Sequence, residues 1–265
     1  MNDNTGACTL TDVHAHLFDY TGDGLRAVID ECESAGVGMA VNTAVSIETA
    51  RTVINQCKLF PRNLRAAAGI SPFDIANAEE GWDNELRGLL ADAMVVAVGE
   101  IGLDSTNPQY PPLDAQMPFF VKQLEIAAAA NLPVIVHSRG IEKRAAEICR
   151  ETGVRKAIFH CFTGGLEAVE YIVKCGYYVS ISGIITYKNS HLRELIRHIP
   201  IDNLLLETDS PYLSPVPHRG KPNKPSYLVH TARETAKLLG IDEATLAEAM
   251  SKNLAVAGVW MAQCL

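Results

Sequence analysis

Thr11-Asp12-Val13-His14-Ala15-His16 is the stretch of sequence that decides the fold. It ends an apolar run with two histidines in alternate positions, and alternate residues of a strand point to the same face. Both imidazoles can therefore point toward one site. Such a pair is typical of metal-binding strands, although strand histidines also occur in cores and on surfaces without a metal. The rest of the chain decides between these interpretations.

Four more residues of metal-ligand type end similar apolar, β-branched runs. The runs extend from Val95 to Glu100, from Val134 to His137, from Ala157 to His160 and from Leu204 to Asp209. These positions are far apart in the sequence. A closed, repetitive sheet would bring the ends of such runs together.

Strand-like and helix-like segments alternate along the whole chain. The eight strand-like runs cover residues 9–16, 38–44, 65–71, 94–101, 132–138, 156–162, 176–183 and 203–209. The segments between them have helical periodicity, as in Leu25, Val28, Ile29 and Cys32, and also in Leu192, Leu195, Ile196 and Ile199. Glycines at positions 36, 153, 176 and 240 are expected at helix ends.

This alternation predicts a parallel sheet, which is either open and doubly wound or closed into a barrel. An open sheet gathers its site at one switch point, whereas a barrel draws residues from the carboxyl ends of many strands. The candidates here come from five strands, so we predict an α/β fold, a TIM-type (β/α)8 barrel with extra C-terminal helices. Residues 1–265 are expected to form a single domain, with Asp242 as the N-cap of a last helix.

The candidate ligands are too many for one ion. One zinc normally takes three or four protein ligands, whereas two ions that share a carboxylate would use six. We expect two divalent metal ions, with His14, His16 and Asp209 on one, His137 and His160 on the other, and Glu100 between them. Imidazole-rich ligation suits Zn, Mn, Fe or Ni, and the carboxylates also allow Mg. The sequence leaves the metal identity open.

Hydrolysis is the chemistry that such a pair of ions favours, because the ions activate a bridging water. Asp209 and Glu100 are the expected catalytic residues, with Asp209 as the general base. A buried carboxylate needs a cation or a hydrogen-bond partner, so a salt bridge from Glu100 to Arg139 is an alternative to the metal. Glu207 and Asp209 are in alternate positions, so one or both of them can face the site.

A proline-rich loop after Asp209 carries three candidate substrate-binding residues, His218, Arg219 and Lys221. A short basic run of this kind is often only a solvated loop. Loops at the carboxyl end of barrel strands, however, are where substrate contacts belong. Arg139 is expected to add a bidentate contact to a phosphate.

Composition limits the remaining choices. The net charge is −8 and the pI is near 5.5, which argues against a broad basic surface for duplex DNA. The seven cysteines are odd in number and dispersed, so we expect buried thiols rather than disulfides or a zinc finger. No apolar stretch is long enough for a membrane span, and the polar start is unlike a signal peptide, so a cytoplasmic protein without membrane contact is expected.

With these motifs in place, the chain resembles the TatD-type metal-dependent deoxyribonuclease family of the amidohydrolase-like superfamily, over nearly its whole length. The motifs that carry the resemblance are Asp-x-His-x-His at 12–16, Gly-Glu-Ile-Gly-Leu-Asp at 99–104, the run from Pro133 that ends in His-Ser-Arg, His-Cys-Phe at 160–162, Glu-Thr-Asp-Ser-Pro-Tyr at 207–212 and Pro-His-Arg-Gly-Lys at 217–221. The resemblance implies a TIM-type barrel, two divalent ions at the positions named above, and hydrolysis of DNA phosphodiesters, in several members from the 3′ ends of single strands.

The sequence departs from the family pattern at two places. Ser71 stands where the family commonly has a histidine, and Ser105 and Thr106 stand where an aromatic residue is usual. The metal set is intact. Two other functions are kept beside the deoxyribonuclease: an amidohydrolase or lactonase of small carbonyl substrates, and a metal-binding scaffold without turnover.

Overall fold

Eight parallel strands follow one another around a closed sheet in the order of the sequence. The computed structural model describes residues 9–259, and each strand pairs in parallel with the next. The strands are β1 (Leu10–Ala15), β2 (Val37–Thr43), β3 (Leu64–Ala68), β4 (Val95–Asp104), β5 (Val134–Arg139), β6 (Ala157–Phe159), β7 (Tyr178–Ile181) and β8 (Leu204–Leu206).

The barrel is closed by the residues that follow β8. Ala15 forms a parallel bridge with Ser210, the amide of His16 donates to the carbonyl of Ser210 at 2.8 Å, and the amide of Asp209 donates to that of His14 at 2.9 Å. The predicted TIM-type barrel is confirmed.

Three strands end three residues earlier than the sequence predicts, although all eight lie where they are expected. β3 ends at Ala68, β6 at Phe159 and β8 at Leu206, each three residues before the predicted end. The backbone leaves the extended conformation beyond two of them, because Cys161 has φ 42° and Asp209 has φ 57°. Candidate residues on these strands therefore lie in the loops just after them.

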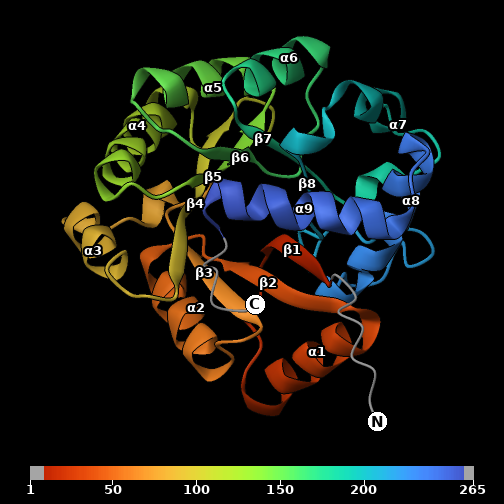
Figure 1. The fold of residues 1–265 in the computed structure, drawn as a ribbon. Coiled ribbons are helices and arrows are strands. Elements are labelled where there is room, and N and C mark those ends of the chain that lie inside the picture. The colour runs from red at the N-terminus through yellow and green to blue at the C-terminus, as the bar shows by residue number, and fades with distance from the viewer. Residues whose placement is uncertain (1–8, 260–265) are drawn as a thin grey trace.

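The helices alternate with the strands, as predicted, and cover the outside of the barrel (Figure 1). Gly36 and Gly240 cap helices in the left-handed conformation, and Gly153 and Gly176 follow one residue after a helix C-cap. The helices are α1 (Gly22–Ala35), α2 (Ile47–Leu59), α3 (Trp82–Leu89), α4 (Leu113–Ala130), α5 (Glu142–Glu151), α6 (Leu166–Lys174), α7 (Leu192–Leu195), α8 (Leu228–Leu239) and α9 (Glu243–Ala257).

The extra C-terminal helix, α9, closes the amino-terminal end of the barrel. Leu254, Ala257 and Val259 join the cluster of buried side chains that includes Val13, Ile135 and other residues of six further strands. Figure 1 looks onto this end, where α9 crosses in front of the strands. The predicted N-cap is confirmed, because the Asp242 carboxylate accepts from the amide of Thr245 at 2.7 Å. With one end closed, the other end is left for a site.

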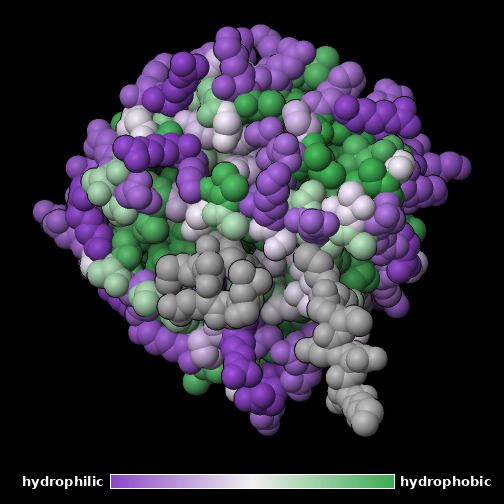
Figure 2. All heavy atoms as spheres, viewed as in Figure 1, coloured by the Kyte–Doolittle hydropathy of each residue, from purple (hydrophilic) through white to green (hydrophobic). Residues whose placement is uncertain are grey.

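The outer surface and the cysteines agree with the composition. In the view of Figure 1, the outer helices present mainly hydrophilic residues (Figure 2).

The cysteines of the described residues are free thiols. Four are buried, namely Cys32, Cys57, Cys149 and Cys161, and Cys175 is partly buried, whereas Cys8 and Cys264 lie outside the described residues. Burial raises the pKa of the Cys32 thiol to about 12, so it stays protonated. Between residues 9 and 259, no helix has the length and apolar character that a membrane crossing requires.

Candidate metal centre

Six predicted side chains converge at the carboxyl end of the barrel, and we call them the metal centre. They come from β1, β4 and β5 and from the residues just after β1, β6 and β8, and each is at most 8% exposed. The members are His14, His16, Glu100, His137, His160 and Asp209.

One half of the metal centre, the β1/β8 half, contains His14, His16 and Asp209. The Nε2 atoms of His14 and His16 are 3.1 Å apart. Oδ1 of Asp209 lies 3.7 Å from Nε2 of His14 and 3.6 Å from Nε2 of His16. Three donor atoms therefore face one small space.

The other half, the β5/β6 half, contains His137 and His160. Nδ1 of His137 lies 3.3 Å from Nε2 of His160. Glu100 lies between the halves: its Oε1 is 3.0 Å from His137 and 3.4 Å from His160, and its Oε2 is 3.7 Å from His14 and 3.5 Å from His16. Each carboxylate oxygen thus faces its own pair of imidazoles, as expected of a bridge. Asp209 also comes within reach of His160, so the boundary between the halves is not sharp.

Burial and neighbouring charges shift the pKa values of Glu100, His160 and His14. Burial opposes the charge of Glu100, but the charges of His160 and His137 and their hydrogen bonds hold its pKa well below the usual value. Burial likewise opposes the charge of His160, yet Glu100 and Glu207 raise the pKa of that imidazole to about 10. Burial and the neighbouring histidines hold the pKa of His14 well below normal.

This donor set fits divalent cations. Imidazole nitrogens and carboxylate oxygens are the ligands that Zn, Mn and related ions take in proteins. The ring nitrogens of neighbouring histidines face one another at about hydrogen-bond distance, where a shared cation would satisfy them together. Three overlapping groups of three ligands can be drawn from the six residues.

Several imidazoles of the metal centre are oriented by groups behind them, of which only Glu207 was expected to face the site. Nδ1 of His16 is 2.9 Å from the carbonyl of Thr43, Nε2 of His137 is 3.0 Å from Oδ2 of Asp104, and Nδ1 of His160 is 3.3 Å from Oε1 of Glu207. Such partners fix the ring and its tautomer, leaving the other nitrogen for a metal. The alternation Glu100, Gly102, Asp104 along β4 was the available signal for Asp104.

Asp12 ties β1 to the end of β8. Its Oδ1 accepts from the amides of Thr208 at 2.9 Å and His14 at 3.2 Å, and its Oδ2 accepts from the Thr208 hydroxyl. Burial outweighs these bonds and raises the pKa of Asp12 to about 8. Asp12 therefore supports the strand that carries His14 and His16 and is not part of the donor set.

The alternative partner for Glu100 is not seen. Among residues 9–259, no ion pair joins Glu100 to Arg139, and the Arg139 guanidinium donates to the carbonyl of Ser138 at 2.7 Å. Glu207 and Asp209 both face inward, as alternate positions allow: Glu207 contacts His160, and Asp209 contacts His14 and His16. The imidazoles of the metal centre, rather than Arg139, are thus the partners of Glu100.

The candidate substrate residues of the proline-rich loop fall into two groups. Arg219 and Lys221 are exposed, and the Arg219 guanidinium lies 4.2 Å from the centroid of the Tyr187 ring. His218 instead stacks on Tyr227 with 3.9 Å between ring centroids, and its Nε2 is 3.1 Å from Nε2 of His230. Its imidazole is thus engaged with residues at and near the start of α8.

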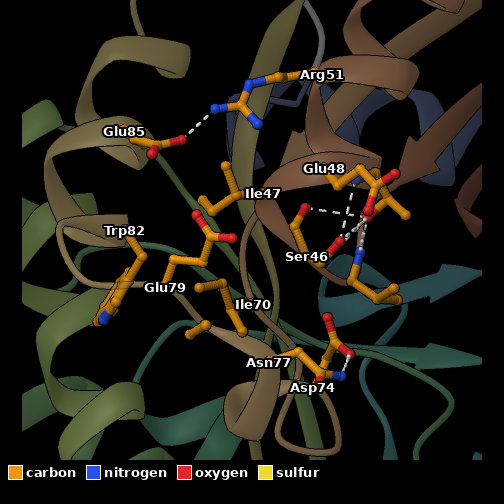
Figure 3. Close-up of a pocket in the computed structure, with 13 residues that line it drawn as sticks. Ser46, Ile47, Glu48, Arg51, Ile70, Asp74, Asn77, Glu79, Trp82 and Glu85 are labelled. Carbon is orange, nitrogen blue, oxygen red and sulfur yellow. Dashed lines mark hydrogen bonds and ion pairs between the residues drawn. The ribbon is translucent and has the colours of Figure 1, made fainter.

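A cavity of about 520 Å³ lies between α2, α3 and the loop after β3 (Figure 3). Ile47, Ile70 and Trp82 supply apolar walls, and Glu48, Asp74 and Glu79 supply carboxylates. None of the six residues of the metal centre lines it. Ser71, the departure from the family histidine, is buried next to Ile70, and its hydroxyl has no hydrogen-bond partner among the described residues.

The closed barrel and its buried histidines and carboxylates define the class of this protein, a metal-dependent hydrolase on a TIM-type scaffold. Comparison with known proteins gives the family. The family model described as TatD related DNase matches residues 11–257, and the chain belongs to this family.

Relatives and solved structures agree with this assignment. The chain is 34% identical to the uncharacterized metal-dependent hydrolase YcfH of Escherichia coli K12, over 93% of this chain and 94% of the relative. It is 33% identical to the 3′-5′ ssDNA/RNA exonuclease TatD of Escherichia fergusonii, over 86% and 90%. The crystal structure of YJJV, a TatD homologue of E. coli K12, superposes with a TM-score of 0.90 at 30% identity, over 96% of this chain and all of that one.

Proposed function

We propose that the protein is a divalent-metal-dependent deoxyribonuclease that hydrolyses phosphodiester bonds of DNA, at the 3′ ends of single strands. The observation that carries the proposal is the position of Glu100, whose two oxygens face two separate pairs of imidazoles. That arrangement suits a pair of ions. The exonuclease name of the E. fergusonii relative supports the choice of substrate.

In this proposal the residues of the β1/β8 half would hold one ion, those of the β5/β6 half would hold the other, and Glu100 would supply a ligand to each. Two divalent ions at such a site would supply an activated water and would stabilise charge on the reacting phosphate. The groups that surround the metal centre keep its imidazoles in place, so that little reorganisation is needed when substrate arrives.

Asp209 is the proposed general base. Its carboxylate lies beside His14 and His16 and is one of the more exposed members of the metal centre, at 8%. It can therefore accept a proton from a group on the substrate side. Arg139, which ends β5 two residues after His137, is a proposed phosphate contact. Arg219 and Lys221 would bind the strand farther out.

The test is hydrolysis of labelled single-stranded oligonucleotides by protein reconstituted with Mg, Mn, Zn or Co. We expect shortening from the 3′ end, inhibition by a chelator, and recovery when metal is added back. Asp209→Asn should lower kcat by roughly 10²- to 10⁴-fold, the usual contribution of a general base. Asp202→Asn, at an exposed carboxylate near the start of β8, is the matched control and should leave kcat unchanged.

Two results would contradict the proposal. Inertness toward all oligonucleotides with every metal, together with turnover of lactones or amides in a parallel panel, would favour the amidohydrolase or lactonase function. Metal binding without turnover of any substrate would favour a scaffold. An unchanged rate in Asp209→Asn would remove Asp209 from the proposed chemistry.

A further inference from the structure

Two aromatic side chains, Phe73 and Tyr110, form a pair of rings, which we call the aromatic corner, beside the β5/β6 half of the metal centre. Phe73 is 39% exposed, so part of its ring is accessible to a ligand. The centroids of the two rings are 5.6 Å apart with an angle of 45° between the planes, and the Tyr110 ring lies 6.5 Å from the imidazole of His137. The corner therefore adjoins a candidate metal ligand directly.

Both rings stand on loops that one helix holds in place. Gln123 of α4 accepts from the amide of Ile70 at 2.7 Å and donates to its carbonyl at 3.0 Å, which fixes the loop of Phe73. Gln116, two turns earlier in α4, makes the same pair of bonds to Asp104 at 2.7 and 2.9 Å, which fixes the loop of Tyr110. Both glutamines are 1% exposed. Rings held in advance lose little conformational entropy when a flat ligand binds.

The charges that line the cavity next to the Phe73 loop disfavour a phosphate chain there. The cavity next to the Phe73 loop carries the carboxylates of Glu48, Asp74 and Glu79, and its Arg51 is paired with Glu85 (Figure 3). Phosphates are repelled there. Arg139 at the end of β5 and Arg219 in the loop after β8 supply the positive charge that would attract a phosphate backbone.

We propose that Phe73 and Tyr110 form a base-stacking subsite, which holds the unpaired base of one of the two nucleotides joined by the scissile phosphodiester. The inference rests on the proposed nuclease function and names the feature of the substrate that this chain recognises. A base in a duplex is already stacked and paired, so the subsite selects single-stranded ends. Stacking on aromatic side chains tolerates every base, so we expect little sequence preference.

The test compares two probes with the same backbone: a single-stranded oligonucleotide, and an oligomer of tetrahydrofuran phosphodiesters that lacks bases. Binding is measured by fluorescence anisotropy on metal-loaded Asp209→Asn protein, so that turnover does not interfere. Adding Phe73→Ala and Tyr110→Ala should weaken binding of the oligonucleotide by roughly 5- to 100-fold, the usual effect of losing a stacked base. Binding of the base-free oligomer should not change. Single abasic nucleotides placed along the strand identify the stacked base.

Matched variants separate stacking from support of the loops. Phe73→Tyr and Tyr110→Phe keep the rings and should retain oligonucleotide binding, and Leu166→Ala, at a 41% exposed residue that begins α6, should also leave it unchanged. Two results would overturn the subsite. One is an equal loss of affinity for both probes in the alanine variants, and the other is equal affinity for both probes in Asp209→Asn protein that keeps Phe73 and Tyr110. Suppose that binding depends on the bases but the wild-type enzyme hydrolyses no phosphodiester. That result would count against the proposed function alone, because the subsite would still have been detected.

Discussion

The two halves of the metal centre differ in the partners behind their imidazoles. In the β1/β8 half the partner is a backbone carbonyl or is absent among residues 9–259, whereas in the β5/β6 half it is a carboxylate. His16 contacts the carbonyl of Thr43, and Nδ1 of His14 has no partner among residues 9–259. His137 and His160 contact Asp104 and Glu207. A carboxylate behind a histidine makes the imidazole a stronger donor. The affinity of the β5/β6 half for a metal ion should therefore depend on Asp104 and Glu207, which are not candidate ligands. The metal affinity of the β1/β8 half should depend on Asp209, which is one.

The largest effect is expected at the one residue that the halves share. Glu100→Gln should remove the bridge and lower kcat on the order of 10⁴-fold, as for a residue on which a whole catalytic unit depends. The metal content of the purified variant, measured by plasma mass spectrometry, should fall for both halves together. Glu167→Gln, at a carboxylate that is 78% exposed, is the control. Full metal content in Glu100→Gln would show that the two halves bind metal independently of Glu100, which would contradict its role as the residue they share.

A smaller and one-sided effect is expected from Asp104→Asn. The change leaves every candidate ligand in place but weakens the support of His137, so metal affinity should fall by about 10- to 100-fold for one ion only. Calorimetric titration of metal into the metal-free protein should show one weakened step and one unchanged step. Saturating metal should restore kcat, which distinguishes positioning from direct chemistry. If both binding steps weaken equally, the carboxylate behind His137 does not act on one half alone, and the proposed difference between the halves is wrong.

The smallest effect is expected at the contact that ties β1 to the end of β8. Thr208→Val removes the hydroxyl bond to Asp12 and keeps the volume of the side chain, so the free energy of unfolding should fall by ~1 kcal/mol. Denaturant unfolding in chelator measures this loss. Thr152→Val, which loses hydroxyl bonds to the backbone of α5, should cost a similar amount while leaving metal binding as in the wild type. A shift in the metal step of Thr208→Val would assign that step to the β1/β8 half.

The sequence was sufficient for the barrel because burial leaves a periodic signal. Strands enclosed by helices are apolar on both faces, and the runs that end in His14, Glu100 and His137 are continuous enough to be recognised. The same regularity placed all six members of the metal centre at one end. Strand ends were less accurate, since the left-handed backbone of Asp209 depends on its bond to the His14 carbonyl, which only the closed barrel provides.

Side-chain direction was the part that the sequence could not supply. His137 turns Nδ1 toward Glu100 because Asp104 engages its Nε2, whereas His16 turns Nε2 inward because Thr43 engages its Nδ1. These choices depend on partners from other elements. His218 illustrates the same limit: its place in a basic loop predicts a substrate contact, but Tyr227 and His230 hold its ring beside α8.

Barrel closure has a consequence for the newly synthesised chain. Asp12 and Thr208 are 196 residues apart, so most of the protein leaves the ribosome before β1 acquires its second neighbour. Until then β1 is a free edge that ends in His14 and His16, and unpaired edges of this kind attract other strands. Chains interrupted just before Asp209 should therefore aggregate, even though they already carry five of the six residues of the metal centre.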